Sequence, residues 1–227
     1  MKKVYTGKTK DVYELPNGNY LLQFKDDCTG KDGKFDPGEN QVGLKIKGIG
    51  QSNLKVTIKF FELLKSKGIK THYASADADK ATMEVVPCKP FGKGLEVICR
   101  RKAVGSFVRR YASVVKEGLP LDYLVEMTLK DDERGDPLIN EEALIQTGMM
   151  TKKNYKSLSK DTKKITKILF TELSKKGLEL IDIKFEFGIT DKGKVLLIDE
   201  IASGNMRVFK NGKSVDPVEL SKLILKN

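Results

Sequence analysis

The feature that most constrains the fold lies within residues 178–201, where two runs of apolar, β-branched and aromatic residues flank the segment Asp191-Lys192-Gly193-Lys194. Two such runs joined by a short glycine-containing segment predict a β-hairpin with a tight turn. If the two central residues of this segment form the turn, Glu186 lies directly opposite Asp199 on the neighbouring strand. The hairpin therefore predicts two carboxylates side by side.

The first strand of this hairpin has two faces of different chemistry. The apolar face, which we assign to the core, contains Ile181, Ile183, Phe185 and Phe187, and the polar face contains Asp182, Lys184 and Glu186. Neighbouring carboxylates repel each other unless a cation lies between them, and Mg²⁺ binds one or two carboxylates together with phosphate oxygens. The structural alternative is a solvated face on which Lys184 neutralises both acids. Because the strands are too apolar for an exposed edge hairpin, we favour charges that line a cleft.

The composition is that of a soluble globular protein, with 227 residues, 39% of them apolar and 32% charged. This length suits one large domain or two small ones. We place the boundary at the connector Pro90–Gly94, which gives an N-terminal lobe of residues 1–90 and a C-terminal lobe of residues 91–227. No apolar run is long enough to span a bilayer, and the first ten residues lack the apolar core of a secretory signal. Three cysteines without metal-ligand spacing are typical of reduced thiols, so we expect a cytoplasmic protein.

The net charge of +11 is compatible with nucleic-acid binding and equally with an enzyme for anionic small molecules. The lysines are scattered, and no arginine-rich run alternates with aromatic residues as a nucleic-acid platform requires. His72 is the only histidine, which argues against a Ser-His-Asp triad, a multi-histidine metal site and a histidine phosphocarrier. We expect His72 to be a structural residue at the start of a strand.

Apolar periodicity and turn residues predict a mixed α+β chain. The predicted strands are Lys3–Thr6, Lys10–Leu15, Tyr20–Lys25, Ile69–Ser75, Met83–Cys88, Leu95–Arg100 and Leu124–Leu129. The predicted helices run from a Ser52 cap to about Lys67, over Ser106–Tyr111, over 157–176, and from a cap near Asp216-Pro217. Residues 26–50 are rich in Gly, Asp and Lys and are predicted to form a long loop.

Three polar segments are candidates for binding anions. The turn Gly7-Lys8-Thr9-Lys10 can lie over phosphates, although it lacks Walker A spacing and an ordinary surface turn would also explain it. In Arg100–Ser106, Ser106 as an N-cap and Arg100 could bind an anion, whereas a capped helix with basic flanks is the alternative. The charged segment Lys130–Pro137 suits either a surface turn or a cleft loop.

Six ordered segments together resemble a known family. They are GKTKDVY (7–13), FKDD (24–27), EVICRRKAVGSFVRR (96–110), KDDERGDPLINEE (130–142), LIDIKFEFG (180–188) and LIDE (197–200). In this order they resemble the motifs of SAICAR synthetase, the phosphoribosylaminoimidazole-succinocarboxamide synthase family of purine biosynthesis. The resemblance implies a two-lobed α+β fold related to ATP-grasp and kinase-like folds, with antiparallel sheets, helices and an ATP cleft between the lobes.

The resemblance also implies an activity and a set of site residues. The family uses ATP and Mg²⁺ to join L-aspartate to the carboxylate of carboxyaminoimidazole ribonucleotide through an acyl phosphate. By position, Lys8 and Lys10 match the lysines of the ATP phosphate loop, and Glu186 and Asp199 match the carboxylates that bind Mg²⁺ and ATP. Arg100, Ser106 and Arg207 match residues that hold the ribonucleotide, and Lys130, Asp136, Asp182 and Lys184 match cleft residues around the reacting carboxylate and amine.

Two segments depart from the family pattern on the substrate side. Gly204 stands where an aspartate is usual, within Ala202–Arg207, and Ile49 stands where a lysine is common; Asn53 is the one member of an amide pair that appears. A relative that makes another amide is therefore the alternative within the family. A basic RNA-binding module and a small-molecule kinase are alternatives outside it. We expect small-molecule partners, no nucleic acid and no membrane, and we leave open whether the protein is a homodimer.

Overall fold

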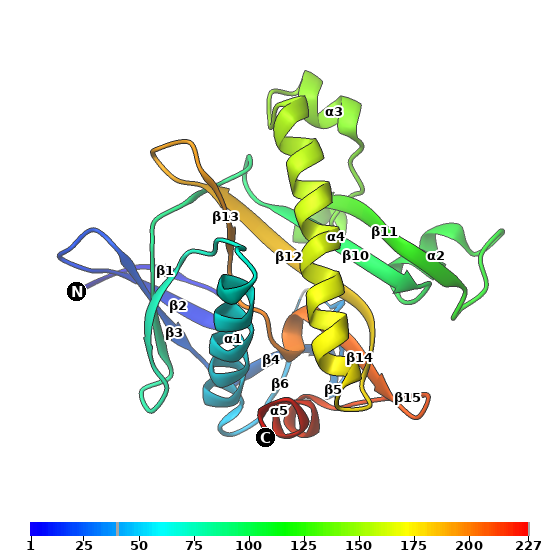
Figure 1. The fold of residues 1–227 in the computed structure, drawn as a ribbon, viewed down its shortest axis with the longest axis horizontal. Helices are drawn as coiled ribbons and strands as arrows, with labels where there is room; N and C mark the ends of the chain where they lie inside the picture. Colours follow the sequence, from blue (N-terminus) through cyan, green and yellow to red (C-terminus); the bar gives the residue numbers. More distant parts are fainter. Residues whose placement is uncertain (40, 227) are drawn as a thin grey trace. The chain divides into compact units, whose positions relative to one another are not determined.

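The computed structural model describes residues 1–39 and 41–226, which form two compact units (Figure 1). Unit 1 comprises Met1–Lys89, Gly188–Asn205 and Val215–Asn227, and unit 2 comprises Pro90–Phe187 and Met206–Ser214. The lobes predicted from sequence, with their boundary at residue 90, remain a prediction; the units differ from them by returning two C-terminal segments to unit 1. Within the described residues no helix is both long and apolar enough to cross a membrane.

Unit 1 is built on an antiparallel sheet whose apolar side chains form one core with a helix. Its strands, in spatial order, are β1 (Lys2–Thr6), β2 (Lys10–Glu14), β3 (Tyr20–Phe24), β8 (Thr82–Val85) and β7 (Tyr73–Asp77). Helix α1 (Ile49–Ser66) packs on β3 and on α5 (Pro217–Leu225), and it buries Leu54, Phe60, Phe61 and Leu64. The strands predicted before residue 26 are confirmed, and Asp216 caps α5 as expected, accepting the amides of Val218 and Glu219.

The predicted start of the first helix at Ser52 is wrong. The helix begins at Ile49, and its N-cap is Gly48, whose φ of 81° lies in the left-handed region. Ile49 is 1% exposed, so its apolar side chain belongs to the core and extends the helix toward the N-terminus. Glycine adopts this cap conformation without a side-chain hydrogen bond, which is why a search for a polar cap residue misplaced the helix end.

The predicted long loop over residues 26–50 is also wrong. The segment forms a small sheet of β4 (Asp27–Lys31), β5 (Lys34–Phe35) and β6 (Val42–Lys45), in the order β5-β4-β6. A Cβ on Gly43 would lie 2.4 Å from the carbonyl carbon of Gly30, so the two backbones touch where both residues lack a side chain. The glycines that suggested a loop therefore permit close strand pairing.

Unit 2 is an antiparallel sheet covered on one face by the longest helix. Its strands, in spatial order, are β11 (Pro120–Leu129), β10 (Leu95–Lys102), β12 (Glu179–Ile189), β14 (Met206–Lys210) and β15 (Lys213–Ser214). Strands β9 (Lys89–Pro90) and β13 (Val195–Ile198) also pair with β12; β13 and the last two residues of β12 belong to unit 1. Figure 1 shows α4 (Lys152–Ser174) lying across β10 and β11, against which it packs. Helix α4 begins five residues before the predicted start, because Thr151 accepts the amide of Asn154 and caps it.

Shorter elements complete the chain. Helix α2 (Ser106–Tyr111) has the predicted bounds, whereas α3 (Glu141–Gln146), capped by Asn140, was not predicted. The remaining elements are the 3-10 turns η1 (Asp132–Arg134) and η2 (Ser203–Asn205).

The predicted two-residue turn between β12 and β13 is wrong. The Thr190 amide donates to the carbonyl oxygen of Lys194 at 2.9 Å, so the turn contains three residues, Asp191–Gly193. Gly193 has a φ of 72°, as expected for a type I turn followed by a left-handed glycine. Asp199 follows the end of β13 and has a φ of 67°, so it stands outside the strand ladder in which its pairing with Glu186 was predicted.

Candidate functional site

The polar side chains of unit 2 share one face of its sheet because they occupy alternate positions on neighbouring strands. Along β10 and β12, Glu96 pairs with Glu186 and Arg100 pairs with Asp182. The intervening residues, among them Val97, Cys99, Ile183 and Phe185, are buried on the opposite face. The β12 alternation expected from the sequence is therefore confirmed: Asp182, Lys184 and Glu186 lie on one face.

Arg100 lies at the centre of a buried ion-pair cluster and is 1% exposed. Its Nε and Nη2 donate to Oε1 of Glu126 at 2.9 and 2.7 Å, and its Nη1 donates to Oδ2 of Asp182 at 2.7 Å. Nη2 also donates to the hydroxyl of Ser106 at 3.0 Å. Two carboxylates of the protein therefore hold the guanidinium in a fixed orientation. The predicted role of Arg100 in binding a ligand anion stays a prediction.

Two further arginines complete what we call the arginine cluster. It consists of Arg100, Arg110, Arg207, Glu126 and Asp182. Arg207 Nη1 donates to Oδ2 of Asp182 at 2.9 Å, and Arg110 Nη2 donates to Oε1 of Glu126. Three guanidinium groups thus surround two carboxylates, and the excess of positive charge favours an anionic ligand. Arg110 and Glu126 were missed in the sequence, although Arg110 ends one of the six family-like segments.

Gly105 leaves room for the Arg207 guanidinium. A Cβ at this position would lie 2.9 Å from Nη2 of Arg207, and the φ of 54° with ψ of −128° suits glycine. Gly105 is also the residue that precedes α2, so the predicted N-cap role of Ser106 is wrong. Ser106 is the first residue of the helix, and its side chain serves Arg100 instead.

Two lysines neutralise the carboxylates at the other end of this sheet face. Lys130 contacts Oε1 of Glu186 at 2.7 Å, and Lys184 contacts Oε1 of Glu96 at 2.7 Å. Burial alone lowers the pKa of Lys184, but the ion pair with Glu96 outweighs it, and the pKa is raised above its ordinary value. Lys184 is therefore a fixed ammonium group at neutral pH.

Glu96 and Glu186 are the carboxylates that the strand register brings side by side. The sequence analysis predicted this arrangement for Glu186 and Asp199, and it missed Glu96. Glu96 lies four residues before Arg100 on the same strand, and this even spacing places both side chains on one face. Asp136 lies in the loop after η1, where its Oδ1 accepts a hydrogen bond from the amide of Asp131 at 2.8 Å.

In unit 1 a hydrogen-bonded turn that contains Lys8 and Lys10 joins β1 to β2. The Gly7 amide donates to the carbonyl oxygen of Lys10 at 2.8 Å, and Lys25 Nζ donates to the carbonyl oxygen of Gly7 at 2.8 Å. Lys8 is exposed on this loop. The close approach at Gly7 leaves no room for a Cβ, which would lie 2.8 Å from the Lys10 oxygen.

Lys10 joins this loop to the segment that follows β13. Its Nζ lies 2.9 Å from Oδ1 of Asp199 and also pairs with the buried carboxylate of Glu200. The structure therefore brings together two predicted site residues, Lys10 and Asp199. Glu200 was missed, although it follows Asp199 directly in the segment LIDE. Asn53, another expected substrate-side residue, accepts the hydroxyl of Ser203 at 2.8 Å.

His72 fixes the backbone at Asp199. Its Nε2 donates to the Asp199 carbonyl oxygen at 2.9 Å from a buried position just before β7. Burial lowers the pKa of His72 to about 4, and the hydrogen bond to Asp199 offsets only part of this effect. The imidazole is therefore neutral in the folded protein at physiological pH.

This burial predicts a pH-dependent stability. Because the pKa is about 4 in the folded state and 6.5 in the unfolded state, His72 costs no stability above pH 6.5, and stability falls as the pH drops from 6.5 toward 4. The expected loss is about 3 kcal/mol in the free energy of unfolding. Urea titrations of the wild type and His72→Gln at several pH values measure it. Identical pH slopes for the two proteins would contradict the assignment.

The donors expected to bind metal lie in different units, Glu186 in unit 2 and Asp199 in unit 1. Among the described residues, no group of three or more His, Cys, Asp or Glu side chains is arranged to hold a metal ion. The three cysteines are free thiols, and burial raises the pKa of Cys28 and Cys88 to about 11, which keeps both protonated at neutral pH.

Comparisons with known proteins identify relatives of this chain. The family model described as SAICAR synthetase matches residues 3–226. The phosphoribosylaminoimidazole-succinocarboxamide synthase of Clostridium tetani is 54% identical over 226 residues, covering 99% of this chain and 100% of the relative.

Two solved structures have the same fold. A SAICAR synthetase in complex with ADP superposes with a TM-score of 0.85 at 31% identity, covering 98% of this chain and 95% of that chain. The SAICAR synthetase of Pyrococcus horikoshii superposes with a TM-score of 0.81 at 30% identity, covering 95% of both chains. The mixed fold of antiparallel sheets and helices is thereby that of the SAICAR synthetase structures.

Proposed function

Because the chain belongs to the SAICAR synthetase family, we propose that its two charged clusters serve the two halves of one ligation. The protein is an ATP-dependent carbon–nitrogen ligase of purine biosynthesis that joins L-aspartate to carboxyaminoimidazole ribonucleotide. The assignment of individual residues to this reaction is our proposal. The observation that supports it best is the arginine cluster, whose excess positive charge is set by buried contacts.

The arginine cluster suits the phosphate of the ribonucleotide. A phosphate monoester has close to two negative charges, and guanidinium groups bind its oxygens in a planar, bidentate geometry. Arg207 and Ser106 are the groups proposed to touch this phosphate. Arg100, with Asp182 and Glu126, holds them in position. Four of its N–H groups already donate to protein acceptors, so we assign it a smaller share in the contact with the phosphate.

The ATP side is proposed to lie in unit 1. The basic turn with Lys8 and Lys10 supplies amides and ammonium groups for the phosphates, and Asp199 lies beside Lys10. We also propose that ATP binds in a cleft between lobes 1–90 and 91–227 and that the fold is related to ATP-grasp and kinase-like folds. The similarity to an ADP-bound SAICAR synthetase supports nucleotide binding.

Glu186 and Asp199 each have the chemistry of a magnesium ligand. Both groups are carboxylates, which together with phosphate oxygens are the ligands that Mg²⁺ prefers. Each carboxylate also contacts a lysine, so cations already balance its charge in this arrangement. When bound, Mg²⁺ would neutralise the charge of the ATP phosphates during phosphoryl transfer.

The proposed chemistry has two steps. An oxygen of the ribonucleotide carboxylate attacks the γ-phosphorus of ATP, the bond to the β-phosphate oxygen breaks, and ADP leaves. The aspartate amine then attacks the acyl carbon, phosphate departs and the amine loses a proton, which gives the amide. Lys130 and Lys184 offset the negative charge of the crowded oxygens, and Asp136 is proposed to orient the incoming amine.

The test is ADP release by the purified protein with Mg·ATP, the ribonucleotide and L-aspartate, each omitted in turn. Dependence on all three, with a succinocarboxamide product identified by mass spectrometry, is the expected result. ADP release without aspartate that yields a stable phosphorylated product would instead indicate a small-molecule kinase. We further propose that the enzyme acts in the cytoplasm without nucleic-acid or membrane partners; its free thiols agree with that compartment.

Gly105→Ala should raise the KM for the ribonucleotide roughly tenfold or more and leave that for ATP nearly unchanged. The new methyl group would displace the Arg207 guanidinium, and the backbone conformation at position 105 strains any residue with a Cβ. Steady-state kinetics with each substrate varied separately provide the measurement. Gly118→Ala is the matched control, since Gly118 also has a positive φ but no neighbouring atom within 4 Å. Equal KM values in both variants and the wild type would refute the role of Gly105.

Gly204→Asp should restore the usual family residue without loss of stability. No atom lies within 4 Å of a Cβ at Gly204, so the substitution meets open space. We expect the midpoint of thermal unfolding to change by no more than about 2 °C, as for surface substitutions. A rise in kcat/KM for aspartate or the ribonucleotide would show that Gly204 limits this enzyme. A large drop in the unfolding midpoint would contradict the open space seen at this position.

A further inference from the structure

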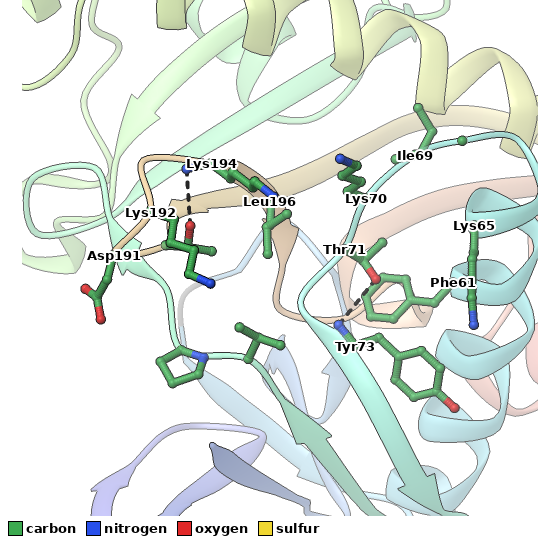
Figure 2. A pocket seen from close by; sticks show the side chains of 14 residues that line it. Phe61, Lys65, Ile69, Lys70, Thr71, Tyr73, Asp191, Lys192, Lys194 and Leu196 are labelled. Atoms are coloured by element: carbon green, nitrogen blue, oxygen red, sulfur yellow. Dashed lines mark hydrogen bonds between the residues drawn. The ribbon is translucent and has the colours of Figure 1, made fainter. Parts of the chain in front are cut away.

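A pocket of about 690 Å³ opens on unit 1, and its lining includes none of the residues assigned to the ligation above (Figure 2). Its walls are the C-terminal end of α1, residues 68–73, and the hairpin of residues 190–196, with Val86 and Pro87 between them. Phe61, Tyr73 and Leu196 give it an apolar lining, and Phe61 and Leu196 are buried. This volume is in the range of small-molecule sites.

Positively charged side chains outnumber negatively charged ones around this pocket. Lys65, Lys70, Lys192 and Lys194 line it, against Asp191 as the one acidic lining residue. Asp191 pairs with Lys89 at 3.4 Å, and Lys65 lies 3.8 Å from Glu62. Within the described part of the chain, no acidic side chain pairs with the other three lysines. Figure 2 shows the Lys192 amine extending over the hollow while the Asp191 carboxylate points away from it.

We propose that this pocket binds a small anion that includes an apolar or aromatic ring, such as an aryl phosphate, sulfonate or carboxylate. The ring would cover the apolar lining, and the anionic group would meet Lys70, Lys192 and Lys194. Removing apolar surface from water and pairing unneutralised ammonium groups both favour such a ligand. Neither an uncharged ring nor a free inorganic anion would satisfy both parts of the site.

The pocket wall is hydrogen-bonded to the segment that leads to Asp199. The His72 amide donates to the Leu197 carbonyl oxygen at 2.9 Å, and the Leu197 amide donates to the Lys70 carbonyl oxygen at 3.3 Å. A ligand in the pocket would restrain this pairing and thereby the backbone before Asp199. The site can thus affect the ATP-binding carboxylate without overlapping it.

Fluorescence titration with 8-anilinonaphthalene-1-sulfonate tests the proposal directly, in the presence of saturating ADP so that the nucleotide site is occupied. This probe has both a ring system and an anionic group. We expect saturable binding to the wild type and a roughly tenfold or larger loss of affinity in Lys192→Glu/Lys194→Glu. The matched control is Lys160→Glu/Lys164→Glu, which makes the same charge change at exposed positions of α4.

A second variant tests the apolar wall. Val86→Asp places a carboxylate at a lining residue that is 37% exposed, so the protein should tolerate it while probe binding falls. Hydrogen exchange should slow on probe binding in peptides covering residues 68–73 and 190–197. Absence of saturable binding, equal weakening in the α4 control, or protection confined to other peptides would each overturn the proposal. Because the readout is binding, it stands or falls independently of the ligation assay.

Discussion

Replacing Asp199 with asparagine is expected to reduce ATP turnover about a thousandfold or more while the protein stays folded. The carboxylate is the proposed ligand of the metal that accompanies ATP, and it also holds Lys10 at 2.9 Å. An amide keeps the size of the side chain but loses the charge that attracts both cations. ADP release at saturating substrates measures the effect, and the thermal unfolding midpoint monitors the fold.

Asp191→Asn provides the control for this substitution. Asp191 lies in the turn of the same hairpin, but it is 84% exposed and forms a surface ion pair with Lys89. Its removal should leave ATP turnover within about twofold of the wild type. If Asp199→Asn retained full activity, the assignment of Asp199 to the metal and ATP would be refuted. Glu186→Gln tests the second proposed metal ligand in the same assay.

Replacing Asp182 with alanine is expected to produce the largest loss of stability of any single change considered. Oδ2 of Asp182 accepts hydrogen bonds from both Arg100 and Arg207, and its side chain is 5% exposed. Removing it leaves the buried Arg100 guanidinium with one carboxylate instead of two and takes the Asp182 contact from Arg207; breaking a buried ion pair in this way typically costs about 3–5 kcal/mol. Chemical denaturation gives the free energy of unfolding, and the KM for the ribonucleotide should rise because Arg207 loses its anchor.

Two comparisons separate the causes of that loss. Asp182→Asn keeps an acceptor oxygen and removes only the charge, so its unfolding free energy should lie between those of the wild type and Asp182→Ala. Asp122→Ala, at an exposed position of β11, should change stability by no more than about 0.5 kcal/mol. A similarly small effect at Asp182 would show that the cluster does not stabilise the fold.

The double variant Asp182→Ala/Arg207→Ala measures the coupling between these two residues. If Asp182 acts on the ribonucleotide through Arg207, the rise in ribonucleotide KM in the double variant should be no greater than in Arg207→Ala alone. Additive changes would mean that Asp182 affects the ribonucleotide by another route.

Local sequence patterns determined several elements directly. Helix α2 over Ser106–Tyr111 and the Asp216 cap of α5 follow from short-range preferences, and both are confirmed. Alternation also determined that Asp182, Lys184 and Glu186 share one face of β12, because side chains of a strand point to opposite faces in turn. The family itself was evident from six ordered segments.

Sequence patterns gave wrong predictions where the backbone conformation depends on what a glycine permits at one position. Gly30 and Gly43 were interpreted as loop residues, yet they allow β4 and β6 to approach closely. Gly48 replaces the expected serine cap, and the left-handed Gly193 lengthens the turn before β13 by one residue. That extra residue changes the register of the hairpin, so the predicted pairing of Glu186 with Asp199 is wrong. On another neighbouring strand, β10, Glu186 pairs with Glu96.

The sequence by itself determined the residue types at the candidate site, since only side-chain chemistry and periodicity are needed to select carboxylates, lysines and arginines on one strand face. The tertiary structure alone decided which of them meet. Glu126 and Arg110 join Arg100 because β11 and α2 lie beside β10, and Lys10 reaches Asp199 across a long stretch of chain. Contacts between residues far apart in sequence depend on strand order and register, and no local preference encodes these.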